Sequence, residues 1–210
     1  MSSRLFQPVT PTAVRRHAPA TERNRDAIAT VLERVLASAS TVLEIGSGTG
    51  QHAAFFGARL PHLAWQPTEV DVELLPSIDA WVSEAALSNV RPARHLDVTS
   101  ADWPLATVDA IVCINVIHIA PPEVLDALLA AAATRLPSGG ALVLYGPFQE
   151  GGRHTAESNE RFDAMLRAQN TAWGVRNLDD VIARATELGL EHAETVRMPA
   201  NNLTVVLRKK

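Results

Sequence analysis

Apolar residues recur along the chain with two different periods, and the change between them predicts a mixed α/β fold. Five apolar positions fit one helix face after a cap at Thr21, and they predict an amphipathic helix that ends near Ala39: Ile28, Val31, Leu32, Val35 and Leu36. The residues before it, 1–20, hold three prolines and no such period. We therefore expect an N-terminal arm whose last residues, 15–20, fold back over the rest of the chain.

After this helix, short apolar runs alternate with helical patterns. The runs predict seven strands, at residues 41–45, 63–66, 93–96, 110–115, 141–145, 194–198 and 203–207. Helices are predicted at 51–59, 72–87 and 122–136. Repeated strand, helix and strand units require parallel crossovers, so we expect a Rossmann-like, mostly parallel seven-stranded sheet with helices on both faces. The last two strands form a hairpin, which places one antiparallel strand near the C-terminus.

The length and composition fit one domain that spans residues 1–210. Hydrophobic residues make up 47% of the chain and charged residues 20%, which is typical of globular proteins. Residues 146–177 depart from a minimal strand and helix unit, with Gly151 and Gly152 followed by Phe162, Met165 and Leu166 on one helical face. We predict that this segment is a lid over the substrate pocket.

Charge and cysteine content disfavour several classes of protein. The net charge is -4 and the basic residues are scattered, which disfavours a nucleic-acid binder. There is no apolar stretch of about 20 residues that could span a membrane. The one cysteine, Cys113, lies in an apolar run and is expected in the core. We expect a cytoplasmic protein; the sequence leaves the oligomeric state open, a homodimer included.

A glycine-rich loop directly follows the first predicted strand. Residues 46–50 read Gly-Ser-Gly-Thr-Gly, and a helix is predicted from Gln51. Such glycines let the backbone turn tightly and approach a ligand at a helix N-terminus. A dinucleotide loop has the spacing G-x-G-x-x-G, but the sixth position here is Gln51, which disfavours a pyrophosphate. Glu44, just before the loop, would repel a pyrophosphate and attract an ammonium group, directly or through water.

This order of strand, acidic residue and G-x-G-x-G resembles the first motif of the class I S-adenosylmethionine-dependent methyltransferases. Five stretches are also similar to a narrower group, the domain of unknown function 938 family, which includes methyltransferase-like protein 26. They are APATERN at 18–24, GSGTGQHAAFF at 46–56, NVIHI at 115–119, YGPF at 145–148 and MPANN at 198–202. The resemblance covers most of the chain and implies S-adenosylmethionine as cofactor, with S-adenosylhomocysteine as product.

The resemblance also implies how the chain would hold this cofactor. Gly46, Gly48 and Gly50 would hold the methionine part together with Glu44. An acid after the second strand would accept the ribose hydroxyls, and we assign Glu69. Asp71 also follows that strand, so the register between the two acids stays open.

Two further positions complete the implied cofactor site. Asp97, followed by Val98, would lie near the adenine amino group after the third strand, although a turn cap is an equal alternative for this aspartate. Asn115 ends the fourth strand at the same edge of the sheet. One departure from the family pattern is Glu69 itself, which stands where a shorter aspartate is expected.

Two residues at strand ends are candidates for catalysis. His118 could accept a proton from a hydroxyl or an amine as the acceptor attacks, because an unperturbed imidazole titrates near pH ~6.5. Tyr145 could orient the nucleophile or the donor through its hydroxyl. The alternatives are a hydrogen-bonded wall residue for His118 and a half-buried aromatic for Tyr145.

Five polar residues are candidates for substrate binding. Arg176 could clamp a carboxylate or a phosphate, and Asn201 and Asn202 could donate amide hydrogen bonds to the same group. Arg23 and Asn24 could join them, while helix capping or surface solvation is the alternative for these residues. The seven histidines are scattered and no H-E-x-x-H occurs, so we predict no metal site.

The sequence therefore predicts an S-adenosylmethionine-dependent methyltransferase that acts on a small polar metabolite at an oxygen or a nitrogen. One alternative is a module that binds the cofactor without catalysis and acts through a protein partner. A dinucleotide oxidoreductase is a second alternative, disfavoured by the glycine spacing.

Overall fold

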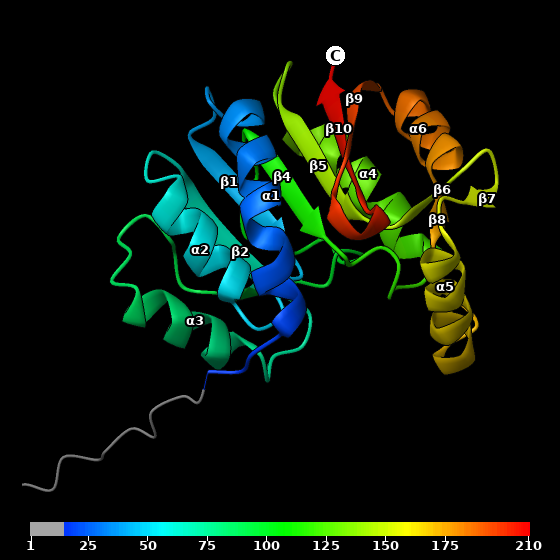
Figure 1. The fold of residues 1–210 in the computed structure, drawn as a ribbon. Coiled ribbons are helices and arrows are strands. Elements are labelled where there is room, and N and C mark those ends of the chain that lie inside the picture. The colour runs from blue at the N-terminus through cyan, green and yellow to red at the C-terminus, as the bar shows by residue number, and fades with distance from the viewer. Residues whose placement is uncertain (1–14) are drawn as a thin grey trace, which may run out of the picture.

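The computed structural model describes residues 15–210, which form a three-layer α/β structure (Figure 1). Seven strands make one sheet in the order β3-β2-β1-β4-β5-β10-β9. Their bounds are β1 Thr41–Ile45, β2 Ala64–Glu69, β3 Arg94–His95, β4 Ala110–Ile114, β5 Ala141–Gly146, β9 Leu190–Arg197 and β10 Leu203–Lys209. Strand β10 runs antiparallel to both of its neighbours, whereas the pairs among β1 to β5 are parallel. The prediction of a Rossmann-like, mostly parallel sheet is confirmed.

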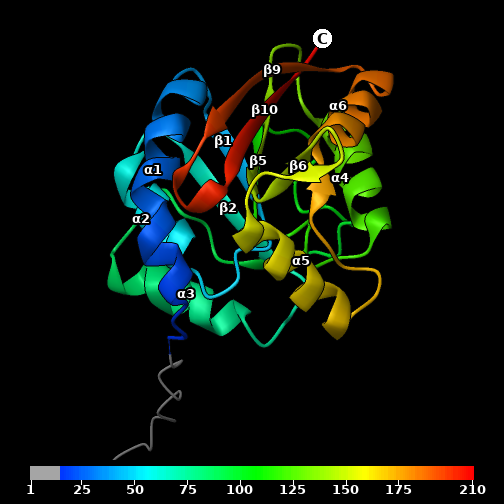
Figure 2. The same ribbon diagram turned by 45° about the vertical axis from the view of Figure 1, so that its right-hand side comes forward.

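Helices cover both faces of this sheet. Helices α1 (Pro19–Val35), α2 (Gln51–Arg59) and α3 (Leu75–Glu84) lie on one face, and α4 (Pro122–Arg135) and α6 (Leu178–Glu187) lie on the other (Figures 1 and 2). Each face has its own hydrophobic core. All residues of β4 and β5 are buried, because a parallel strand covered on both faces contacts no solvent. Cys113 is one of these buried residues.

The segment predicted as a lid contains a second, smaller sheet. Its strands, in the order β7-β6-β8, are β6 Phe148–Glu150, β7 Arg153–His154 and β8 Arg176–Asn177. Helix α5 (Glu157–Gln169) connects β7 to the turn before β8 and lies beyond the carboxyl end of the main sheet (Figure 2). On α5, Leu166 is buried but Met165 is 49% exposed, so the packed face is not the one predicted from Phe162, Met165 and Leu166.

Several boundaries differ from the sequence prediction. Helix α1 begins at Pro19 rather than after Thr21, because a proline suits the first helical turn and Ala18 is already extended. Strand β9 begins at Leu190, ahead of the predicted start, and α6 was not predicted. After the buried Leu190, residues 191–193 of β9 are exposed at the edge of the sheet, so this part of the strand lacks an apolar run. Of the predicted arm, residues 1–14 lie outside the described part of the chain.

Candidate functional site

A cavity of about 910 Å³ lies at the carboxyl edge of the main sheet. Residues within 18–21, 45–49, 69–74, 96–99 and 114–124 line it, together with His52, Asn170 and Trp173. The carboxyl ends of β1, β2, β3 and β4 therefore all lead into one space, which is where open α/β sheets bind their ligands.

The glycine loop forms one wall of this cavity and has a backbone that only glycine adopts easily. Gly46 and Gly50 have φ values of 64° and 94°. A Cβ on Gly46 would lie 2.4 Å from Val116 Cγ2, and one on Gly50 would lie 2.4 Å from Ile78 Cα. Gly46 and Gly48 line the cavity, whereas Gly50 packs against α3 behind it.

The carboxylate of Glu69 lies at the cavity wall and is tied to the glycine loop. Its Oε2 accepts a hydrogen bond from the Gly48 amide at 2.8 Å, and its Oε1 accepts from the amides of Val70 and Asp71 at 2.8 and 3.1 Å. Glu69 is buried, and Asp71 is exposed and accepts a hydrogen bond from the Glu73 amide. Of the two acids left open by the sequence, the structure brings Glu69 to the cavity.

Asp97 and Val98 line the cavity beyond β3. Asp97 Oδ1 accepts hydrogen bonds from the Thr99 hydroxyl at 2.7 Å and the Thr99 amide at 2.9 Å. These bonds lower the pKa of Asp97, the hydroxyl contributing most. One oxygen of Asp97 therefore caps a turn, as one of the two alternatives from the sequence had it, while Oδ2 has no hydrogen-bond partner among residues 15–210.

Glu44 does not line the cavity. Its side chain is buried under the loop, where Oε2 accepts hydrogen bonds from the Ser47 hydroxyl at 2.8 Å and from Trp65 Nε1 at 3.0 Å. Burial raises the pKa of Glu44 to about 7, although these two hydrogen bonds act in the opposite direction. In this structure Glu44 therefore supports the loop from below.

Asn115 lines the cavity with a φ of 59° and donates its amide to the Tyr145 carbonyl at 2.8 Å. The Tyr145 side chain is buried and is not part of the cavity lining. Its hydroxyl accepts a hydrogen bond from Asn202 Nδ2 at 3.0 Å, and burial raises the pKa of Tyr145. Asn202 and Asn24, which is also buried, act in the opposite direction and lower that pKa.

The His118 ring is 1% exposed and does not line the cavity. Neither ring nitrogen has a hydrogen-bond partner among the described residues, and the rings of His118 and Phe148 pack nearly perpendicular to each other, with centroids 5.3 Å apart. Burial lowers the pKa of His118 to about 3, so the ring is neutral at physiological pH. The imidazole lies directly beside Gly146, where a Cβ would come within 2.3 Å of Nε2.

Arg176 is used within the protein and does not line the cavity. Its guanidinium donates hydrogen bonds to the backbone carbonyls of Ile117 and Ala120, after β4, and of Ala172. Burial lowers the pKa of Arg176. The guanidinium thus ties the small sheet to the loop that lines the cavity.

Arg23 and Asn201 lie away from the cavity. Arg23 is exposed on α1. The side chain of Asn201 donates to the Ser158 hydroxyl, and its carbonyl accepts from Asn159, which joins the turn before β10 to α5. Of the five predicted substrate residues, the structure groups only Asn24 and Asn202, around the Tyr145 hydroxyl.

A family model described as "Protein of unknown function (DUF938)" matches residues 15–209. The chain belongs to the DUF938 family.

Solved structures share the fold of this DUF938 protein. The S-adenosylmethionine-dependent methyltransferase SibL, in its apo form, has a TM-score of 0.74 and 18% identity over 90% of this chain and 55% of its own. An O-methyltransferase family 2 protein from Planctomyces limnophilus, in complex with apigenin, has a TM-score of 0.76 and 18% identity over 91% of this chain and 58% of its own. PigF with S-adenosylhomocysteine has a TM-score of 0.73 and 17% identity over 87% of this chain and 54% of its own.

These likenesses establish the fold of the DUF938 chain as that of the class I S-adenosylmethionine-dependent methyltransferases. The chain spans little more than half the length of each of these three proteins.

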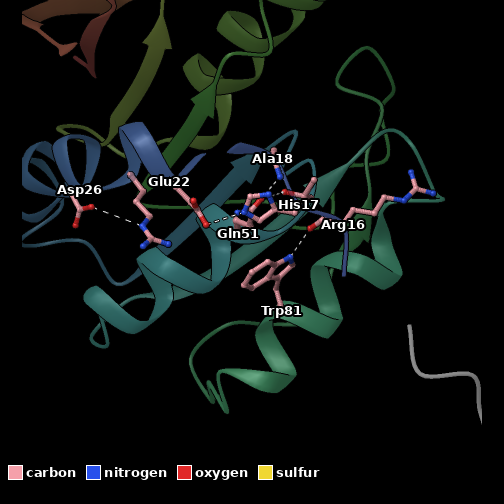
Figure 3. Close-up of polar contacts among 9 residues, drawn as sticks. Arg16, His17, Ala18, Glu22, Asp26, Gln51 and Trp81 are labelled. Atoms are coloured by element: carbon pink, nitrogen blue, oxygen red, sulfur yellow. Dashed lines mark hydrogen bonds and ion pairs between the residues drawn. The ribbon is translucent and has the colours of Figure 1, made fainter. Parts of the chain in front are cut away.

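The segment before α1 makes polar contacts with α2 and α3 that the sequence pattern did not specify (Figure 3). The Arg16 amide donates to Ser77 Oγ at 2.8 Å, and Trp81 Nε1 donates to the Arg16 carbonyl at 2.9 Å. The Ala18 amide donates to Gln51 Oε1 at 2.5 Å. This strap of residues 15–18 lies over α2 and α3 and brings Ala18, at its end, to the cavity.

The sequence prediction missed several polar residues of the cavity wall, among them two on helices α1 and α2. Thr21, read as a helix cap, is buried in the first turn of α1 and lines the cavity. His52 lies within the quoted motif GSGTGQHAAFF and also lines the cavity. A pattern search for loop glycines and strand-end acids does not detect them, because they come from helices whose orientation the fold decides.

The charged residues that line the cavity are all acidic. Glu69, Asp97 and Glu123 line it, but no lysine or arginine does among the described residues.

Over residues 15–210, no helix has the length and apolarity to cross a membrane. Within the same part of the chain, no group of three or more His, Cys, Asp or Glu side chains is arranged to hold a metal ion.

Proposed function

We propose that this DUF938 protein is an S-adenosylmethionine-dependent methyltransferase with a small-molecule acceptor. The observation that carries the proposal is one cavity whose wall presents, in order, the glycine loop, the carboxylate of Glu69 and the carboxylate of Asp97. This series suits the amino-acid part, the ribose and the adenine of the cofactor.

The residues of the cavity fit the cofactor in three respects. A Cβ on Gly48 would meet no atom within 4 Å, so this part of the wall is open for close approach of a ligand. Glu69 Oε2 accepts one hydrogen bond and retains a lone pair for a ribose hydroxyl. Asp97 Oδ2 has no hydrogen-bond partner among the described residues, and Val98 next to it offers an apolar contact for the base.

When bound, the cofactor would supply a methyl group on a sulfonium, which the acceptor would attack in line at the methyl carbon while S-adenosylhomocysteine leaves as a neutral thioether. The chain then has to position the acceptor and exclude water, and these two effects can supply most of the rate enhancement over the uncatalysed reaction. Asn115 lies at the cavity wall beside the end of β4, and we assign it the role of orienting the acceptor. His118 stays a candidate base, but the segment around Phe148 and Gly174 would have to move for its ring to reach an acceptor.

The charge of the cavity narrows the class of acceptor. An anionic acceptor would meet Glu69, Asp97 and Glu123 without any lysine or arginine in the wall to compensate. Arg176, which the sequence offered as a carboxylate clamp, is occupied by three backbone carbonyls. We therefore infer a neutral or cationic acceptor that is methylated at oxygen or nitrogen.

Calorimetric titration tests the proposal directly. We expect S-adenosylhomocysteine to bind and NAD(P)H not to bind. Binding of the nicotinamide cofactor alone would establish the oxidoreductase alternative instead. Methyl transfer from labelled S-adenosylmethionine is then measured across a panel of neutral, cationic and anionic metabolites. Cofactor binding without transfer to any of them would favour the non-catalytic module that acts through a protein partner.

A further inference from the structure

His52 presents its imidazole to the amino-acid end of the cavity. It lies in the first turn of α2, directly after the glycine loop, and lines the same cavity as Ser47, Thr49 and Thr21. Long side chains on a helix point back toward the helix N-terminus, which here is the loop. The ring is stacked on Phe56, with centroids 5.1 Å apart and an angle of 6° between the planes. Its orientation is therefore fixed.

A hydrogen bond to Asn24 decides which nitrogen of His52 carries the proton. Nε2 lies 2.9 Å from Asn24 Oδ1. An amide oxygen only accepts hydrogen bonds, so Nε2 is the protonated nitrogen. Nδ1 then carries the lone pair and has no hydrogen-bond partner among residues 15–210.

The surroundings of His52 keep the ring neutral. Burial, with a smaller contribution from the Arg25 guanidinium, lowers the pKa of His52 to about 4. Nδ1 is consequently a hydrogen-bond acceptor throughout the physiological pH range. Glu44, which the sequence placed at this end of the ligand, is turned away beneath the loop.

We propose that His52 Nδ1 accepts a hydrogen bond from the ammonium group at the amino-acid end of the cofactor. An ammonium group has three donors and no acceptor, so it needs an unprotonated partner such as this nitrogen. Glu69 and Asp97 lie farther along the wall, after β2 and β3, and face the parts of the ligand that we assign to ribose and adenine. The inference rests on the proposed function. It adds His52 to the proposed cofactor site, which so far consists of the loop glycines and the acids Glu69 and Asp97.

The test compares two ligands in the full chain. S-adenosylhomocysteine carries the ammonium group, whereas 5′-methylthioadenosine has the same nucleoside and sulfur but lacks the amino-acid end. Both are titrated by calorimetry into the wild type, His52→Phe and His52→Asn. His192→Phe, on the exposed part of β9, is the matched control. Melting temperatures establish that each variant is folded.

We expect His52→Phe to bind S-adenosylhomocysteine roughly 10- to 100-fold more weakly and 5′-methylthioadenosine unchanged, because one hydrogen bond to a charged group is lost. His52→Asn retains an acceptor near the position of Nδ1 and should restore much of the affinity, and the control should match the wild type.

Equal weakening for both ligands in His52→Phe would overturn the assignment, as would unchanged affinity for S-adenosylhomocysteine. Lower turnover with unchanged affinity would also overturn it and would make His52 a base or an acceptor-binding residue. If the wild type binds neither ligand, the proposed function itself fails, and this inference fails with it.

Discussion

At the scale of single residues, the structure gives the same type of side chain different tasks. Glu44 and Glu69 were both predicted as cofactor-binding residues from their positions near the ends of β1 and β2. In the structure, Glu69 lies at the cavity wall and Glu44 lies in the core beneath the loop. The two histidines near the site differ in the same way, because His52 lines the cavity and His118 is enclosed. Burial and contacts, rather than residue type, decide these roles.

Glu44 should make the stability of the protein depend on pH. Its pKa is raised to about 7 in the folded state from an ordinary value of 4.5, so the folded state binds the proton more tightly. The resulting stabilisation is complete below pH 4.5 and is lost as pH rises through 7. In the wild type, the free energy of unfolding should therefore fall by up to about 3 kcal/mol between pH 5 and pH 8. In Glu44→Gln, which cannot titrate at this position, this decrease should be absent. Urea unfolding at both pH values measures it; an unchanged pH dependence would contradict this account.

His118 can be tested without assuming that it is a base. His118→Asn should lower turnover by about 10²-fold or more if the imidazole accepts a proton, while affinity for S-adenosylhomocysteine stays unchanged. Turnover is measured with an acceptor from the panel, and calorimetry supplies the affinity. Unchanged turnover would remove His118 from catalysis and leave it a buried wall residue, as its enclosed position suggests.

At the scale of elements, the turn between β1 and α2 depends on backbone conformation. Gly48 has a φ of 57° and lines the cavity, and a Cβ there would meet no other atom of the protein. Gly151, in the turn between β6 and β7, has a φ of 58° and equally open surroundings, but it does not line the cavity. The two glycines thus share a left-handed backbone conformation and differ in whether they line the cavity.

This pair separates a structural role from a binding role. Gly48→Ala and Gly151→Ala should each lower the free energy of unfolding by about 1–2 kcal/mol, because alanine is strained in the left-handed region. Only Gly48→Ala should also weaken S-adenosylhomocysteine binding, by ~10-fold or more, since its methyl group would enter the space of the ligand. Equal affinity in the two variants would show that the loop does not contact the cofactor.

At the scale of the whole molecule, Arg176 connects the small sheet to the loop that follows β4 of the main sheet. Arg176 lies in β8 and donates to the carbonyls of Ile117 and Ala120, in the loop that follows β4. The backbone amide of Gly174 reinforces this contact by donating to the His118 carbonyl at 2.9 Å. The cavity wall after β4 therefore depends on a segment that lies far from it in sequence.

Arg176→Met should loosen both partners of this contact. The variant keeps an apolar stem but leaves buried carbonyls without a donor, which should cost about 1–3 kcal/mol of stability. Hydrogen exchange should become faster in residues 117–120 and 172–176 together. If turnover were instead impaired for anionic acceptors only, with exchange unchanged, Arg176 would be the substrate clamp that the sequence first offered.

The order of elements, the parallel sheet and the glycine loop could be read from the sequence because each rests on local information. Apolar runs separated by helical patterns define strands, and the loop glycines keep their spacing whatever surrounds them. The small sheet was not predictable, since its strands of two or three residues carry no periodic signal and form by pairing with distant segments.

The sequence by itself thus determined the fold class, the edge of the sheet that carries the site, and the acids that follow its strands. Only the tertiary structure decided which side chains reach the cavity. Glu44 and Arg176 are turned into the protein by partners distant in sequence, such as Trp65 and Ile117. His52 and Thr21 reach the wall because α1 and α2 pack side by side over the sheet. Side-chain direction depends on such packing, and one-dimensional spacing does not record it.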